Sequence, residues 1–175
     1  LVRGGQGRGP PPVPPPAEEI SGPLTVAGPR EIAFVLGPVP HQPIALADTA
    51  SNRIVRRFPL NKGNITSRAS SPDGKTLYAA AGGSIWAVPS SGGEARMIRA
   101  GDSVAADPSG RQLVISVTES AKFRLFRVPL EGGPEQKIVT DGSIPLMGGP
   151  SLSPNALGAE VRPPQPLEPL DPWFS

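Results

Sequence analysis

A single histidine is the first residue to consider for chemistry in this chain. His41 lies in Val39-Pro40-His41-Gln42-Pro43, and the 175 residues include no cysteine. Transition-metal sites need three or four nitrogen, sulfur or oxygen ligands, so one imidazole without a thiolate does not indicate one. A Ser-His-Asp triad would need a positioned serine, and no Gly-x-Ser-x-Gly elbow is present. The sequence assigns His41 a surface or turn role and predicts no catalytic residue, no metal and no cofactor.

Five aspartates lie beside small turn residues, where a carboxylate accepts hydrogen bonds from nearby backbone N–H groups. One set brackets a tight hairpin with an acid, an amide and a guanidinium, namely Asp48, Asn52 and Arg53. We expect these three side chains to bond one another and the backbone. No carboxylate cluster has the spacing of a calcium loop. The five aspartates are Asp48, Asp73, Asp102, Asp107 and Asp141.

A basic segment contains Arg53, Arg56, Arg57, Lys62 and Arg68. Neighbouring residues of a strand point to opposite faces, so Arg56 and Arg57 divide their charge between two surfaces. The net charge is only +2, and the aromatic residues lie in strand phrases and do not form a stacking platform for nucleic acid. The pattern favours a solvated surface, leaves an anionic docking site as the alternative, and makes Arg56 and Arg57 candidate partner-binding residues.

Two large apolar side chains, Trp173 and Phe174, lie at the proline-bounded C-terminus. They either pack against the body of the protein or anchor a partner, because buried aromatic residues often dominate binding energy. No apolar run approaches the ~20 residues of a membrane span.

A repeat must position these residues. Ser71-Pro72-Asp73-Gly74-Lys75-Thr76-Leu77 is matched by Asp107-Pro108-Ser109-Gly110-Arg111-Gln112-Leu113. Proline presets φ and glycine accepts positive φ, so each phrase predicts a turn, and alternating Leu77 and Ala79 predict a half-buried strand after it. A period of about 40 residues with strand content is typical of β-propeller blades. The repeat comprises Pro72, Asp73, Gly74, Trp86, Gly92, Gly93, Pro108, Gly110, Phe126, Gly132 and Gly133.

The glycine pairs of the repeat predict hairpin turns. None of them begins a nucleotide-binding loop, so nucleotide binding is not expected. Trp86 and Phe126 occupy equivalent positions, which indicates packing between blades. We also match Ile54–Leu60 to the third strands of the later blades, and we expect a lengthened loop at Thr118–Lys122.

The predicted fold is all-β, a partial propeller of about three blades, each a four-stranded antiparallel sheet, with proline-rich irregular ends. Residues 1–23 are expected to form an extended tail or linker, because their proline run favours polyproline II. The blades are placed at 24–63, 64–100 and 101–149, followed by a stub at 150–161 and a proline-rich tail at 162–175.

The turn phrase, together with Ile85-Trp86 and Gly92-Gly93-Glu94, resembles the TolB-type WD40-like (PD40) β-propeller repeat family. Such repeats also occur in propellers attached to prolyl oligopeptidase-like peptidases and bacterial Ser/Thr kinases. Residues 47–54 are similar to NHL-type blades. The resemblance covers roughly residues 40–155 and implies a bacterial, periplasmic setting.

Three blades and a stub fall short of the roughly 4–8 blades of a closed propeller. Protein partners or further copies of the chain are therefore expected to cover open sheet edges. We expect no nucleic-acid partner and only indirect contact with a membrane. The sequence favours a non-catalytic binding or scaffold module within a larger assembly. A regulatory propeller of a larger kinase or peptidase, and an accessory subunit of a membrane-attached complex, remain alternatives; the start at Leu1 suggests a processed or incomplete product.

Overall fold

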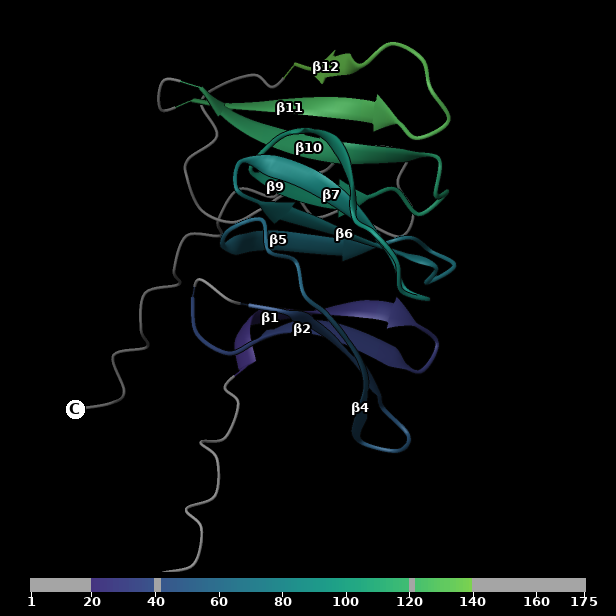
Figure 1. Ribbon diagram of the computed structural model, residues 1–175. Coiled ribbons are helices and arrows are strands. Elements are labelled where there is room, and N and C mark those ends of the chain that lie inside the picture. The colour runs from purple at the N-terminus through teal and green to yellow at the C-terminus, as the bar shows by residue number, and fades with distance from the viewer. Residues whose placement is uncertain (1–19, 40–41, 120–121, 140–175) are drawn as a thin grey trace, which may run out of the picture.

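The computed structural model describes residues 20–39, 42–119 and 122–139, and this part of the chain contains strands and turns but no helix (Figure 1). The strands form three four-stranded sheets in which sequence neighbours pair antiparallel. The sheets lie one above another, in chain order, from β1–β4 to β9–β12 (Figure 1). The all-β architecture of three four-stranded antiparallel sheets is thereby confirmed.

Each sheet is one blade, and its strands follow the order of the sequence from the inner to the outer edge. The first contains β1 (Ile20–Gly28), β2 (Glu31–Leu36), β3 (Ile44–Asp48) and β4 (Arg53–Phe58). The second contains β5 (Ile65–Ser70), β6 (Thr76–Ala81), β7 (Ser84–Pro89) and β8 (Arg96–Ala100). The third contains β9 (Ser103–Ala106), β10 (Gln112–Glu119), β11 (Lys122–Pro129) and β12 (Gln136–Ile138).

The middle blade packs against a neighbouring blade on each face, and its strand β6 is buried on both. Leu77 and Ala79 of β6 belong to an apolar cluster shared with the first blade, whereas Tyr78 and Ala80 belong to one shared with the third. Burying a side chain such as Leu77 stabilises the fold by about 1.5–3 kcal/mol. The expectation of a half-buried β6 was therefore wrong, because the third blade covers the face that Tyr78 occupies.

Hydroxyl groups of the inner strands join the blades near their common axis. Ser67 on β5 accepts a hydrogen bond from the Val104 backbone N–H at 3.1 Å and another from the Ser103 hydroxyl at 3.1 Å. Thr66 donates to the Asp102 carbonyl at 2.9 Å, and Ser70 donates to the Val26 carbonyl at 2.5 Å. These bonds link β5 to the blade on either side, and they hold the inner strands in register.

The two proline turns have the same backbone bonds. The Ser71 N–H donates to the Thr76 carbonyl at 2.8 Å, as the Asp107 N–H does to the Gln112 carbonyl at 3.0 Å. Gly74 and Gly110 end the turns at φ of 69° and 71°. Turn chemistry read from the sequence thus describes both turns correctly.

Three expectations about boundaries differ from the structure. The first strand begins at Ile20, inside the segment expected to be a tail, because Ile20 and Ser21 pair with Leu36 and Val35. The ladder is interrupted between Ser21 and Thr25, where Pro23 has no N–H to contribute. The irregular ladder thus accommodates Pro23 within a strand.

The phrase Ile54–Leu60 does not form a third strand. Its residues to Phe58 form β4, the outermost strand, and the next sheet begins at Ile65. β4 ends just before Pro59, whereas Pro89 and Pro129 are the last paired residues of β7 and β11. A strand ends at each proline, because proline has no N–H to donate to the ladder. Proline thus marks the end of the outermost strand in the first blade and of the third strand in the two later blades.

The hairpin at Thr118–Lys122 does not carry a lengthened loop. Glu119 pairs directly with Lys122, and β10 and β11 have 8 residues each where β6 and β7 have 6. The additional residues extend the two paired strands, because ladder pairing satisfies backbone groups that a loop would expose.

Candidate functional site

A groove of about 460 Å³ lies at the rim between the first and second blades. The first blade supplies most of its walls, from the turn before β2 to β4, and the second blade supplies the turn after β7. Its lining includes two cations, two acids, an apolar side chain and a serine: Arg30, Arg56, Glu31, Asp48, Val55 and Ser90.

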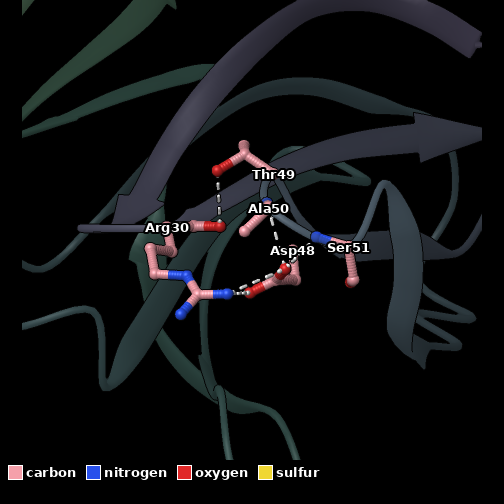
Figure 2. A network of polar contacts seen from close by, with 5 residues as sticks. All are labelled: Arg30, Asp48, Thr49, Ala50 and Ser51. Atoms are coloured by element: carbon pink, nitrogen blue, oxygen red, sulfur yellow. Dashed lines mark hydrogen bonds and ion pairs between the residues drawn. The ribbon is translucent and has the colours of Figure 1, made fainter.

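Asp48 organises one side of this groove (Figure 2). Its Oδ1 accepts hydrogen bonds from the backbone N–H groups of Ala50 at 3.0 Å and Ser51 at 2.6 Å. The Arg30 guanidinium lies 3.4 Å from its Oδ2, and the Thr49 hydroxyl donates to the Arg30 carbonyl at 3.0 Å. The hydrogen bond from the Ser51 N–H is the main reason that the pKa of Asp48 lies below its ordinary value. Asp48 is therefore an ionised turn carboxylate whose acceptor capacity is largely used.

The expected set of Asp48, Asn52 and Arg53 is only partly brought together. Asp48 and Arg53 are paired across the β3–β4 ladder, and Asn52 adopts a left-handed φ of 54° in the turn between them. The guanidinium that reaches the carboxylate is nevertheless that of Arg30, which sequence reasoning missed. Arg30 belongs to the preceding hairpin, and only the pairing of β2 with β3 carries it to Asp48.

Arg56 joins the two blades across the groove. Its Nη1 donates to the Ser90 carbonyl at 2.5 Å, so a predicted partner-binding residue has a structural contact on the second blade. Arg57 is its neighbour on β4 and pairs in register with Ala45, whereas Arg56 pairs with Leu46. The expected division of the two arginines between opposite faces agrees with this register.

The strand that carries these arginines is unusually exposed. Every residue of β4 except Phe58 is exposed, including Ile54 at 37% and Val55 at 50%. β4 hydrogen-bonds to β3 only, so its outer edge has no strand partner among the described residues. Leu46 pairs with Arg56 and Ala47 with Ile54, so β4 itself contains a bulge at Val55, which has no partner on β3.

The equivalent aromatic residues lie between blades, as their repeat positions predict. Trp86 packs against the cluster of the first and second blades, and Phe126 packs against that of the second and third. Each ring faces a cation from the preceding unit: Lys62 Nζ lies 4.7 Å from the Trp86 centroid, and Arg99 Cζ lies 4.5 Å from that of Phe126.

Other predicted residues lie outside the part of the chain that the structure describes. These are His41, Trp173 and Phe174, together with the segments at 1–19 and 140–175 that contain most of the expected tails and the stub. Within the described ranges, no group of three or more His, Cys, Asp or Glu side chains is placed to hold a metal ion. The same ranges contain no helix long and apolar enough to cross a membrane.

Comparison with known structures identifies the stack as part of a β-propeller. TolB from Acinetobacter baumannii is similar with a TM-score of 0.63 and 18% identity, over 78% of this chain and 36% of that one. A chain of the nidogen/laminin complex gives 0.59 and 15%, over 78% and 53%. The tricorn protease gives 0.56 and 16%, over 67% and 13%.

The chain thus spans about half or less of the length of these proteins. No protein-family model matches the sequence, and the comparison with curated proteins gives no match either. At these identities the likeness establishes the fold, which is a partial β-propeller of three described blades, and it leaves the role to be argued from the site.

Proposed function

We propose that this chain is a non-catalytic protein-binding module of TolB-type WD40-like blades, and that it works as a subunit or segment of a larger extracytoplasmic assembly. The observation that carries the proposal is the size of the stack. The described residues build three blades, and a closed propeller has roughly 4–8. On this proposal, further protein completes the ring or covers the open sheet edges, and a rigid stack of sheets presents its loops and edges for that contact.

The site supports binding more than catalysis. The Asp48 carboxylate is engaged by two backbone N–H groups and Arg30, and Arg56 is engaged by Ser90. Groups with these bonds hold the shape of a surface, whereas a general acid or base must exchange a proton with a bound molecule. The periplasmic setting follows from the resemblance of the repeats alone.

Cross-linking in the source cells followed by native mass spectrometry tests this proposal. We expect a defined complex in which the 18.1 kDa chain is present at fixed stoichiometry with another protein. A lone 18.1 kDa species after efficient cross-linking would contradict it. The identity of the cross-linked protein separates a scaffold from an accessory subunit of a membrane-attached complex.

A second candidate is a regulatory propeller within a larger enzyme. The similarity to a segment covering 13% of the tricorn protease chain favours it, because that protein combines such a fold with a much longer polypeptide. Continuation of the reading frame into a catalytic domain would support this candidate.

A further inference from the structure

We propose that the outer edge of β4 binds an extended acidic segment of a partner protein, which joins the first sheet as an additional strand. This inference rests on the proposed protein-binding function, and it adds the binding surface and the chemistry of the partner. Strand addition needs a free edge, exposed side chains that favour strands, and charges that select the partner. β4 provides all three.

The free edge distinguishes β4 from the inner side of the same sheet. At the inner side, β1 lies against β5 of the second blade, and the Ser70 hydroxyl donates to the Val26 carbonyl there. At the outer side, the described sheet ends with β4, which has 6 residues. The corresponding edge of the third blade is β12, which has only 3 residues and offers a much shorter template.

The side chains of this edge combine apolar and cationic character. Ile54 and Val55 are exposed β-branched residues, which suit contact with an added strand. They lie between Arg53 and Arg56, whose guanidinium groups can each donate two hydrogen bonds to a carboxylate. A purely solvated surface would not require the two aliphatic side chains.

Among the described residues, Arg56 of β4 has no ion pair with the second blade like the one that Arg99 of β8 has with the third. Arg99 of β8 pairs with Glu135, which follows the glycine pair of the third blade. The same repeat position in the second blade, after Gly92 and Gly93, is Ala95. Arg56 reaches a neutral carbonyl at Ser90 instead, so its positive charge remains available to a partner.

These charges also select against a second copy of the chain. Pairing two β4 strands edge to edge would bring three arginines of one copy, Arg53, Arg56 and Arg57, close to those of the other. Like charges on adjacent strands are destabilising. An acidic strand gains from Arg53 and Arg56, both of which are exposed on this strand.

Fluorescence anisotropy with the full chain tests the proposal, with a labelled peptide of alternating glutamate and valine as the probe. A peptide of alternating lysine and valine is its matched control. We expect saturable binding of the acidic peptide only, weakened about tenfold or more by Arg56→Glu and by Arg53→Glu, and also by raised salt. Lys137→Glu on β12 is the control variant and is expected to leave binding unchanged. Circular dichroism and thermal melting of each variant identify any that fail to fold.

Hydrogen–deuterium exchange separates strand addition from simple charge attraction. We expect the acidic peptide to slow exchange at the β4 amides while the β12 amides are unaffected. Absence of binding, equal loss of binding in Lys137→Glu, or binding without protection of β4 would each overturn the inference. If cross-linking nevertheless finds a stoichiometric partner on another face, the proposed binding function stands and only this surface is rejected.

Discussion

Ser109 donates a hydrogen bond from its hydroxyl to the carboxylate of Asp107, and the preceding blade makes the same bond with the two residue types exchanged. There the hydroxyl of Ser71, at the first position of the turn, donates to Asp73 at the third, at 2.7 Å. Each turn therefore contains one hydroxyl and one carboxylate across the same two positions, in either order.

This exchange predicts that the two positions are coupled. Asp107→Ser should lower the free energy of unfolding by about 1–3 kcal/mol, because Ser109 and Gln112 lose a charged acceptor at a site only 8% exposed. Adding Ser109→Asp recreates the arrangement of Ser71 and Asp73 and should recover much of that loss. Urea unfolding of both single variants and the double variant measures the coupling, and strictly additive effects would show that the two positions do not act as a pair.

Acid should destabilise the protein through these carboxylates. The Ser71 hydroxyl is the largest cause of the lowered pKa of Asp73, followed by the Lys75 N–H. At Asp107 burial raises the pKa, but hydrogen bonds from Ser109 and Gln112 outweigh it, so that its pKa is also lowered.

Because both folded-state pKa values lie below the ordinary value of 3.8, the unfolded chain takes up protons first as the pH falls. The stabilisation is complete above that value and is lost as the pH drops through the lower folded-state values. The urea concentration at the midpoint of unfolding should therefore decrease as the pH is lowered below about 4. Asp107→Asn should show a shallower fall, and a midpoint independent of acid down to about pH 2 would contradict the assignment.

Two turn glycines in equivalent positions should differ in their tolerance of alanine. Both have positive φ, so alanine costs roughly 1–2 kcal/mol at either site. A Cβ at Gly74 would also lie 2.2 Å from the Ala27 carbonyl oxygen, whereas one at Gly110 would lie 3.4 Å from its nearest neighbour, Pro72. Gly74→Ala should therefore lower the melting temperature more than Gly110→Ala, and equal effects would argue against close contact between the first turn and β1.

The hydroxyl of Ser67 should contribute measurably to the contact between the second and third blades. Ser67→Ala leaves the Val104 N–H, on a residue 2% exposed, without its acceptor, so we expect a loss of about 1–3 kcal/mol. Ser91→Ala, in an exposed turn, provides the matched control and should be neutral within about 0.5 kcal/mol. Urea unfolding of the two variants side by side measures the difference, and equal midpoints would contradict a role for Ser67 between the blades.

The repeat phrases allowed the second and third blades to be predicted because each turn and strand is encoded locally. Pro72, Gly74, Pro108 and Gly110 impose the same backbone wherever they occur, and the strands follow from the apolar pattern after them. The first blade was less predictable, since its strands begin without that phrase and Pro23 lies inside a ladder. Its outermost strand could be placed only by knowing that β3 pairs with β2 and β4.

The groove was not predictable for a related reason. Its Arg30–Asp48 pair joins residues of different hairpins, and its Arg56–Ser90 bond joins different blades. Such pairs depend on how units stack, which no local pattern states. One signal was available in the sequence: Glu135 and Ala95 occupy equivalent positions, so the second blade lacks at that position the acid that pairs with Arg99 in the third.

The paired extension of β10 and β11 has a consequence for engineering. Each added residue on one strand has a partner on the other, so the hairpin grew outward while the register at its base, where Leu113 pairs with Val128, matches that of Leu77 with Val88. The far end of this hairpin should therefore accept grafted epitopes or reporter sequences in balanced increments. A graft there should leave the contacts between blades intact. This hairpin is therefore a suitable site for immobilising or labelling the molecule.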